Sequence, residues 1–351
     1  MNHDSIIYSA FRSLFKGFFW VIGFALALVI AIIIISAAVG AAATASTTSL
    51  DQTTSVTILP DSDGVRTSSN SLPVLLQLNI NGIIGIDELT QDKIRTVLIE
   101  SREGDLKDDR VKGVLLRIES PGGTVVDADG IYRAVKEYKE RYKIPVIAYI
   151  DGLCASGGMY VACSADKIYA SDASLVGSVG VIITSFLNFS QLLDKVGVQA
   201  LTISAGKGKD DMDPLRPWKP GEEVNYRSIC DYYYHYFVNI VTSNRPGLNK
   251  EKLVQEYGAY VFPATLAKEY GYIDGSGINE SDVLKILASE AKIEGKYQVV
   301  SLESKTIWSQ LFKADSPLLT GMIKHEVQIP SNMDLNLQGK FLYLYQPDSP
   351  Y

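Results

Sequence analysis

From residue 73 onward, short apolar runs alternate with longer amphipathic segments. The apolar runs predict strands at 74–80, 111–118, 146–150, 167–170, 179–184 and 198–203. Helical spacing of apolar residues predicts helices over 89–104, 125–142, 155–164 and 189–196, and a mainly helical part follows at 219–244, 249–257, 263–270 and 279–292. This alternation of strands and helices predicts an α/β fold with right-handed crossovers and a mostly parallel sheet.

The N-terminal part carries a different pattern. No residue from Gly17 to Leu50 is charged, and Ile, Val, Leu, Phe and Ala dominate its core. About 20 such residues span a bilayer, so we expect one transmembrane anchor at 17–43. Arg12 and Lys16 precede it, which places residues 1–16 in the cytoplasm and the rest of the chain outside. The alternative is a cleaved signal peptide, which the length of the apolar run disfavours.

Three further segments follow the anchor. Ser and Thr fill 14 of the 28 positions from 44 to 71, so we expect a solvated tether over 44–72. The folded domain then spans 73–293. The extension at 294–351 has no regular pattern until the apolar run Phe341-Leu342-Tyr343-Leu344-Tyr345, which is compatible with an edge strand or an interface strand.

Composition excludes some classes of function. The net charge of −7, without a basic cluster, argues against nucleic acid as a partner. Cys154, Cys163 and Cys230 are an odd number of thiols, and a helix over 155–164 would hold the first two too far apart for a disulfide. We expect buried thiols instead. No metal-ligand spacing is present, and we expect neither a metal nor a cofactor.

The stretch CASGG, residues 154–158, crowds small residues around Ser156 where a strand passes into a helix. Small residues there permit either close packing or a reactive hydroxyl beside free backbone N–H groups. A serine nucleophile needs a base, and histidine is the usual one. His3 precedes the anchor, His235 lies in a tyrosine-rich helix and His325 lies in the tail, so a Ser-His-Asp hydrolase is disfavoured.

Lysine is the other candidate base, provided that burial away from carboxylates removes its proton near neutral pH. The stretch ISAGKGKDDMDP, residues 203–214, places Lys207 and Lys209 in a glycine-containing loop after an expected buried strand. Two solvated loop lysines are the alternative reading. A third stretch, SPGG at 120–123, offers bare N–H groups for an oxyanion, or a turn that requires positive φ.

Together these stretches resemble the signal peptide peptidase A family of membrane-anchored serine peptidases with a Ser/Lys dyad. The resemblance covers about 73–293 and runs in order through SPGG, DGLCASGGMYVACSADKIYA (151–170), LVGSVGV (175–181), GKGKDDMDP (206–214) and YVFPATLAKEYGYIDGSG (260–277). It implies a spiral of ββα units, as in the Clp protease and crotonase superfamily. Glu119, before SPGG, departs from the Asn or Asp usual there.

The resemblance also assigns site residues by position. Ser156 matches the nucleophile, Lys209 the general base and Ser178 the hydroxyl that orients the lysine; Gly123 and the N–H of Gly157 match the oxyanion hole. It implies ring- or dome-shaped homo-oligomers in which the lysine can come from a neighbouring subunit. The implied substrates are released signal peptides and other unfolded membrane-proximal segments, cut at small or apolar residues through an acyl-enzyme.

Two other functions remain to be weighed. A crotonase-type acyl-CoA enzyme could share the fold and the paired N–H groups, but it would need cytoplasmic CoA and would not need Ser156. A non-catalytic scaffold, tethered to the membrane and oligomeric, would bind partners without using Ser156 at all. Labelling with a fluorophosphonate separates both from a serine peptidase.

Overall fold

In the computed structural model of the chain, the described residues are 20, 54–86, 89–304 and 341–345. The chain divides into two units, Met1–Thr53 and Thr54–Tyr351. The expected anchor at 17–43 lies outside the described residues, apart from residue 20. Within the described residues, no helix has both the length and the apolar character needed to cross a bilayer.

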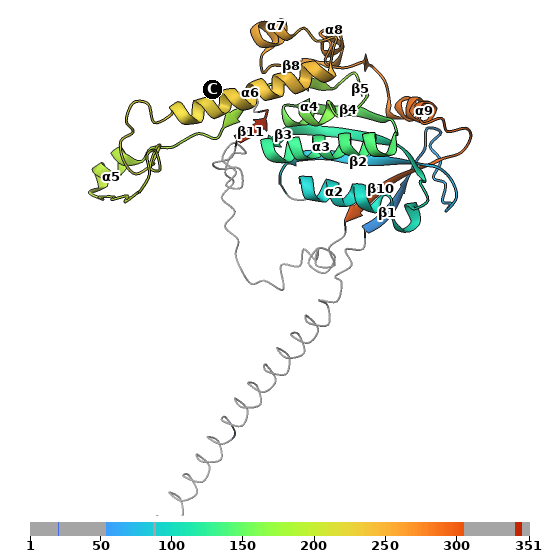
Figure 1. Cartoon of the computed structure of the whole chain (residues 1–351), viewed down its shortest axis with the longest axis horizontal. Helices are drawn as coiled ribbons and strands as arrows, with labels where there is room; N and C mark the ends of the chain where they lie inside the picture. The colour runs from blue at the N-terminus through green and yellow to red at the C-terminus, as the bar shows by residue number, and fades with distance from the viewer. Residues whose placement is uncertain (1–19, 21–53, 87–88, 305–340, 346–351) are drawn as a thin grey trace, which may run out of the picture. The chain divides into compact units, whose positions relative to one another are not determined.

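The second unit is built on one sheet of eleven strands (Figure 1). The strands are β1 (Thr54–Leu59), β2 (Val74–Ile84), β3 (Val111–Thr124), β4 (Val146–Ala155), β5 (Lys167–Ala170), β6 (Leu175–Gly177), β7 (Ile182–Ile183), β8 (Val261–Pro263), β9 (Gly275–Ser276), β10 (Gln298–Ser304) and β11 (Phe341–Leu344). The main path runs β1-β10-β2-β3-β4-β5-β9, and it is parallel from β10 to β9. The predicted α/β fold with a largely parallel sheet is confirmed.

Helices cover both faces of this sheet. The helices are α2 (Gln91–Glu100), η1 (Gly104–Leu106), α3 (Val125–Tyr142), α4 (Gly157–Ala162), α5 (Ser190–Val196), α6 (Val224–Asn244), α7 (Lys250–Lys252), η2 (Leu253–Tyr257), α8 (Ala264–Glu269) and α9 (Glu280–Glu290). Apolar residues of α2, α3, α4 and α6 join one core cluster, whereas α9 packs in a second cluster that includes Leu75, Leu115 and Ile147. The central strands are mostly apolar because most of their residues are buried between the two layers of helices.

Local signals explain where the helices begin. The hydroxyl of Thr124 accepts the N–H of Asp127 at the start of α3, and Thr90 and Asn279 cap α2 and α9 in the same way. Lys143, in the left-handed conformation, ends α3. The Thr124 cap fixes where β3 passes into α3, just after the SPGG stretch.

The ends of the folded unit extend further than the pattern predicts. We expected a solvated tether over 44–72, yet Thr54–Leu59 forms β1 and pairs antiparallel with β10. Arg110 donates hydrogen bonds to the carbonyls of Ser69 and Leu72, which holds the following segment on the domain. A Thr-rich edge strand carries little apolar periodicity, but its β-branched residues still suit a sheet edge.

The extension at 294–351 likewise supplies two strands to the sheet. β10 lies between β1 and β2, and β11 pairs antiparallel with both β3 and β7. The apolar run 341–345 is therefore a strand, but one inserted between two others within the same chain. On β3 its partners are Gly122, Gly123 and Thr124, at the end of the SPGG stretch.

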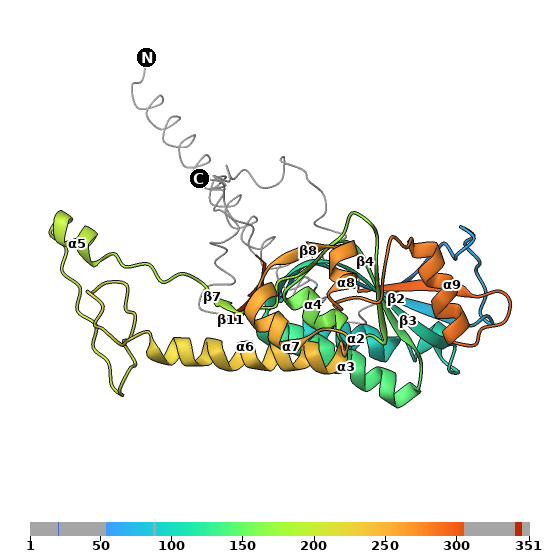
Figure 2. The ribbon, with the colours of Figure 1, turned by 90° about the horizontal axis from the view of Figure 1, so that it is seen from above.

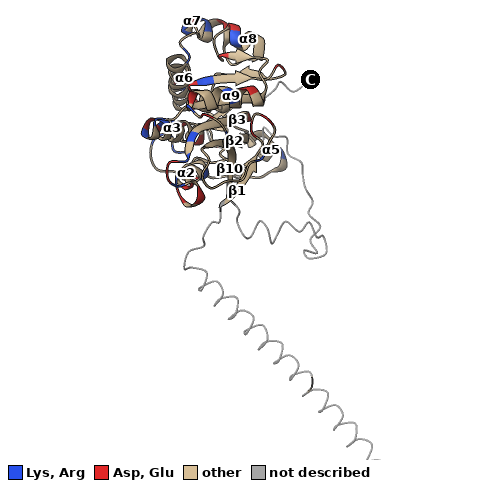
Figure 3. Ribbon diagram, turned by 90° about the vertical axis from the view of Figure 1, so that its right-hand side faces the viewer, with Lys and Arg blue, Asp and Glu red and all other residues tan. Residues whose placement is uncertain are grey.

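Charged side chains are mixed in sign over the surface. Figure 3 shows Lys and Arg beside Asp and Glu on α2, α3 and α8, with tan residues across the sheet between them. Net charge and this mixture together give no broad basic surface on this side of the molecule.

Candidate active site

Ser156 lies at a strained corner between β4 and α4. Its backbone has φ 54° and ψ −116°, a conformation that a non-glycine residue adopts at a cost, and its N–H donates to the carbonyl of Gly177 at 2.9 Å. The side chain does not cap α4 and is only 1% exposed. A sharp strand-to-helix turn of this kind is how enzymes of the α/β-hydrolase fold present a serine nucleophile.

The strands on either side bring Gly123 to this corner. β3 and β4 are parallel neighbours, paired from Val114↔Val146 through Ser120↔Cys154, so their carboxyl ends meet at one edge. A Cβ atom added at Gly157 would lie 3.1 Å from the nitrogen of Gly123. The two residues expected to form an oxyanion hole are therefore adjacent. Gly157 is the first residue of α4, where N–H groups have no partner within the helix.

A peptide strand crosses this pair of glycines. In the antiparallel pairing of β11 with β3, Tyr343 lies opposite Gly123 and Leu344 opposite Gly122, and the N–H of Tyr345 donates to the Pro121 carbonyl at 2.7 Å. A Cβ added at Gly122 would lie 1.9 Å from the Tyr343 carbonyl oxygen and 2.6 Å from the Gly157 nitrogen. The carbonyl of Tyr343 thus points to the place where an oxyanion hole would receive a peptide carbonyl.

The other side of this strand is bounded by β7. Phe341 and Leu342 pair with Ile183 and Ile182, so β11 fills a slot between β3 and β7. Main-chain hydrogen bonds on both sides are the usual way to hold an extended peptide whatever its side chains. The slot is therefore suited to binding peptides in one register beside Ser156.

Ser178 lies close to the end of the same slot. It adopts φ 57°, is buried, and donates its N–H to the carbonyl of Tyr260 at 2.7 Å. It also lines a cavity of about 410 Å³. The other lining residues are Gly180, Val181, Ile182, Ala259, Tyr260, Val261, Leu344 and Tyr345. A side chain entering this cavity could reach the Ser178 side of the site.

Lys209 does not join these residues within one subunit. Residues between β7 and α6 form an arm that carries α5 and projects from the body beyond the end of α6, whereas α4 lies inside the body (Figures 1 and 2). Lys207 and Lys209 are both exposed on this arm. The strand expected at 198–203 is absent: Leu201 is 85% and Ile203 87% exposed, and none of the strands in the described part of the chain pairs with this run.

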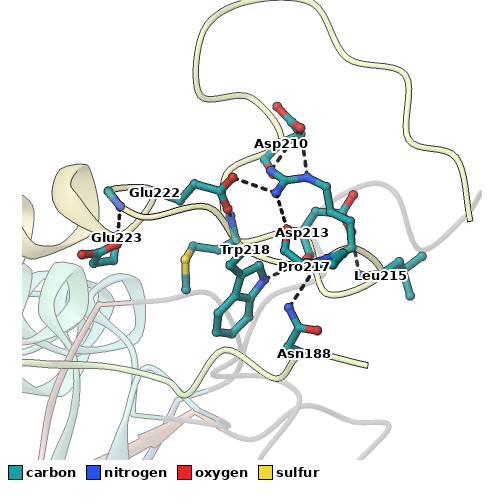
Figure 4. A network of polar contacts seen from close by, with 11 residues as sticks. Asn188, Asp210, Asp213, Leu215, Pro217, Trp218, Glu222 and Glu223 are labelled. Carbon is teal, nitrogen blue, oxygen red and sulfur yellow. Dashed lines mark hydrogen bonds and ion pairs between the residues drawn. The ribbon is translucent and has the colours of Figure 1, made fainter. Parts of the chain in front are cut away.

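A network of polar contacts orders the arm next to Lys209. Arg216 pairs with both Asp210 and Glu222, which are labelled in Figure 4: its Nη1 contacts Glu222 at 2.7 Å and its Nη2 contacts Asp210 at 3.1 Å. Glu222 also accepts the N–H of Met212, and the indole of Trp218 donates to the carbonyl of Asp213. Burial would raise the pKa of Glu222, but the hydrogen bonds from Arg216, Met212 and Lys219 and the charge of Arg216 together outweigh it, and the pKa lies below its usual value.

Protonation of Glu222 should loosen this network. A carboxyl whose folded-state pKa is lowered stabilises the folded form above its unfolded pKa, about 4.3, and that contribution is lost as the pH falls through the folded value. In a Trp20→Phe, Trp308→Phe background Trp218 is the single tryptophan. We expect its emission to shift to the red below about pH 4.3.

Two variants test the assignment. Glu222→Gln should show the shifted emission already at neutral pH and lose the acid transition. Glu223→Gln is the matched control, because the Glu223 carboxylate accepts the N–H of Gly221 and takes no part in the contacts of Arg216. An acid transition that survives unchanged in Glu222→Gln would show that another group controls the arm.

The three cysteines and the histidines are the remaining candidate reactive residues. All three cysteines are free thiols; burial raises the pKa of Cys154 well above its usual value and that of Cys163 to about 12. The prediction of buried thiols is confirmed for these two, whereas Cys230 is half-buried. His235 is exposed on α6, and the other two histidines lie outside the described residues.

Sequence reasoning did not identify the aromatic residues beneath β11. Tyr160 on α4 and Phe237 on α6 both contact the ring of Tyr343, and the Tyr343 hydroxyl donates to the carbonyl of Tyr233 at 3.0 Å. The tyrosine-rich run in α6 was the available signal, but its helical spacing alone does not show what the rings contact. They form a pocket at the position opposite Gly123.

Comparison with known proteins is consistent with this geometry. Residues 138–294 match the sequence profile of Peptidase family S49. A protein of Synechocystis sp. named as a protease is 34% identical over 248 residues, which cover 69% of this chain and 87% of that protein. A protein of Enterococcus faecium named as a signal peptide peptidase SppA is 32% identical over 231 residues, 62% of this chain. A Methanocaldococcus jannaschii protein named as a protease is 36% identical over 187 residues, 53% of this chain. The match spans 64% of the second of these proteins and 58% of the third.

Proposed function

This chain belongs to Peptidase family S49, and we propose that it is a serine endopeptidase that works through a Ser156/Lys209 dyad. The observation that carries the proposal is the strand β11, which lies in the slot beside Ser156 with the Tyr343 carbonyl directed between Gly122, Gly123 and Gly157. A peptide substrate held in the same way would place its carbonyl carbon against the serine hydroxyl.

The reaction follows from these positions. The neutral amine of Lys209 takes the proton of Ser156 Oγ as the oxygen attacks the peptide carbonyl carbon. The N–H groups of Gly123 and Gly157 stabilise the negative oxygen, a contribution of about 3 kcal/mol per donor. The C–N bond then breaks, the lysine returns its proton to the leaving amine, and an acyl-enzyme remains. Water, deprotonated by the same lysine, hydrolyses that ester and restores the Ser156 hydroxyl.

The position of the arm favours a dyad shared between two subunits. A lysine acts as a base only where burial removes its proton, and Lys209 is exposed on its own subunit. The arm around it exposes large apolar side chains, which suit a protein interface better than solvent. These are Leu187, Phe189, Leu192, Val196, Val198, Leu201 and Ile203. We propose that the arm docks on a neighbouring copy and delivers Lys209 through the cavity beside that copy's Ser178.

The substrates and location form part of the same proposal. An anchor at 17–43 would hold the second unit outside the cytoplasm, at the membrane surface where released signal peptides and other unfolded segments occur. A slot that binds an extended backbone accepts unfolded chains and excludes folded ones. No cofactor or metal has a place in this mechanism.

Labelling by a fluorophosphonate tests the proposed activity. We expect the full-length protein to gain one adduct on Ser156, located by mass spectrometry of the digested protein, and to lose peptidase activity in proportion. Ser164→Ala is the control and should be labelled like the wild-type protein, since Ser164 is a buried serine whose hydroxyl donates to the carbonyl of Val161. A non-catalytic scaffold and an acyl-CoA enzyme both predict that Ser156 stays unlabelled, and that result would overturn the proposal.

A further inference from the structure

The slot beside Ser156 ends in an aromatic pocket, and the residue in it identifies a substrate preference. Tyr343 is completely buried there. Its ring stacks on Tyr160 with centroids 5.2 Å apart and an interplanar angle of 21°, and it lies 4.4 Å from the centroid of Phe237. Its hydroxyl donates to the carbonyl of Tyr233 at 3.0 Å. Every part of this side chain therefore has a matching partner.

The main chain of β11 shows which residue of a substrate would place its side chain in this pocket. The carbonyl of Tyr343 is the one directed at Gly122 and Gly157, so the bond presented to Ser156 is the one between Tyr343 and Leu344. The residue that supplies that carbonyl is the P1 residue of a peptidase substrate, the residue just before the cut bond. The aromatic pocket is thus the S1 pocket, which binds the P1 side chain.

The walls of the pocket are held rigidly. The hydroxyl of Tyr160 donates to Asp129 at 2.8 Å, and Arg133 pairs with the same carboxylate at 2.8 Å. Tyr160 and Phe237 are both fully buried and pack against each other with centroids 5.2 Å apart. A small P1 side chain would leave the faces of these rings that now contact Tyr343 without a partner, and an apolar space of that size is costly to leave empty.

We propose that this peptidase prefers tyrosine at P1, recognised by Tyr160, Phe237 and the carbonyl of Tyr233. The proposal rests on the proposed serine peptidase function and adds its specificity. Burial also raises the pKa of the Tyr343 hydroxyl, so a tyrosine in this pocket keeps the proton that it donates to Tyr233. Phenylalanine would fill the pocket but leave that carbonyl without the hydrogen bond.

A peptide series tests the preference with the full-length protein. The peptides share one unstructured sequence and carry Tyr, Phe, Leu or Ala at a single P1 position. We expect kcat/KM for Tyr to exceed that for Phe by about 3- to 10-fold, the value of one hydrogen bond, and that for Ala by about 10²- to 10³-fold. Cleavage after Ala at a rate equal to or above that after Tyr would overturn the proposal.

A pocket variant adds an independent readout. Phe237→Leu removes the ring that faces Tyr343 and should lower the Tyr-to-Ala ratio of kcat/KM by about 3- to 10-fold. Tyr142→Leu is the matched control, because Tyr142 belongs to a separate ring pair with Tyr138 and should leave the ratio unchanged. An unchanged ratio in Phe237→Leu would count against the pocket.

The two proposals fail in different ways. If none of the peptides is cleaved and Ser156 takes no fluorophosphonate, the peptidase function itself is wrong. If Ser156 is labelled and peptides are cleaved without regard to an aromatic P1 residue, the peptidase function stands and only the specificity is wrong.

Discussion

Ser156→Ala and Lys209→Ala are each expected to lower kcat on an unfolded peptide by about 10⁴-fold or more, since a nucleophile and its base act as one unit. Ser156→Ala removes the attacking oxygen, and Lys209→Ala removes the group that takes its proton. Lys207→Ala should retain near-normal turnover, because that lysine matches no position in the dyad. Turnover lost in Lys207→Ala but kept in Lys209→Ala would reverse the assignment of the base.

Mixing the two inactive proteins tests whether the dyad is shared between subunits. Each site needs an intact Ser156 from one subunit and an intact Lys209 from its neighbour. Equal amounts of Ser156→Ala and Lys209→Ala chains, dissociated and reassembled at random, should therefore regain roughly a quarter of the wild-type activity. The control is each variant reassembled alone, which should stay inactive. If the lysine acts within its own subunit, the mixture will also be inactive, because no chain then carries both residues.

The sequence predicted the central sheet well because each buried strand carries its own signal. VKGVLLRI at 111–118 and KIYA at 167–170 are bounded by polar segments and lie where expected as parts of β3 and β5. Their burial on both faces requires apolar residues at nearly every position. β3 nevertheless continues through SPGG to Thr124, where its partners are β2 and β11, and no local pattern shows these partners.

Edge segments were predicted less well for the same reason. β1 contains three hydroxyl residues among its first four positions, Thr54, Ser55 and Thr57, so its local pattern resembles a tether, yet β10 gives it a partner from the other end of the domain. The run 198–203 is apolar enough for a strand, but no strand pairs with it among the residues that the structure describes. A local apolar pattern does not show whether a neighbouring strand is available.

For the same reason, only part of the candidate site could be predicted from the sequence. Gly123 and Ser156 follow neighbouring parallel strands, and the carboxyl ends of such strands meet, so their proximity could be predicted. The pocket around Tyr343 could not be, because α4, α6 and β11 supply its parts from positions far apart in the chain. The pairing of Lys209 with Ser156 stays a prediction, since the arm holds the lysine away from the body of its own subunit.

Gly122→Ala is expected to lower kcat/KM by about 10²- to 10³-fold, an effect as large as that of losing one donor of an oxyanion hole, because it keeps the substrate carbonyl out of that hole. The new methyl group would lie 1.9 Å from the position of the Tyr343 carbonyl oxygen and 2.6 Å from the Gly157 nitrogen, so it would occupy the space that a substrate carbonyl needs. No flexible side chain is available to move, because both neighbours are backbone atoms. Steady-state kinetics on a peptide with tyrosine at P1, together with the rate of fluorophosphonate labelling, measures the loss.

Gly82→Ala separates this steric effect from backbone strain. Gly82 has φ +89° and Gly122 has φ +101°, so alanine is strained at either position, but an added Cβ at Gly82 meets nothing within 4 Å. Backbone strain should lower the unfolding temperature of both variants, and Gly122→Ala should fall further because its methyl group also clashes with backbone atoms; Gly82→Ala should keep most of its activity and its rate of labelling. If Gly122→Ala stayed within about three-fold of Gly82→Ala in kcat/KM, a difference of about 0.6 kcal/mol, the carbonyl would not bind where β11 places it.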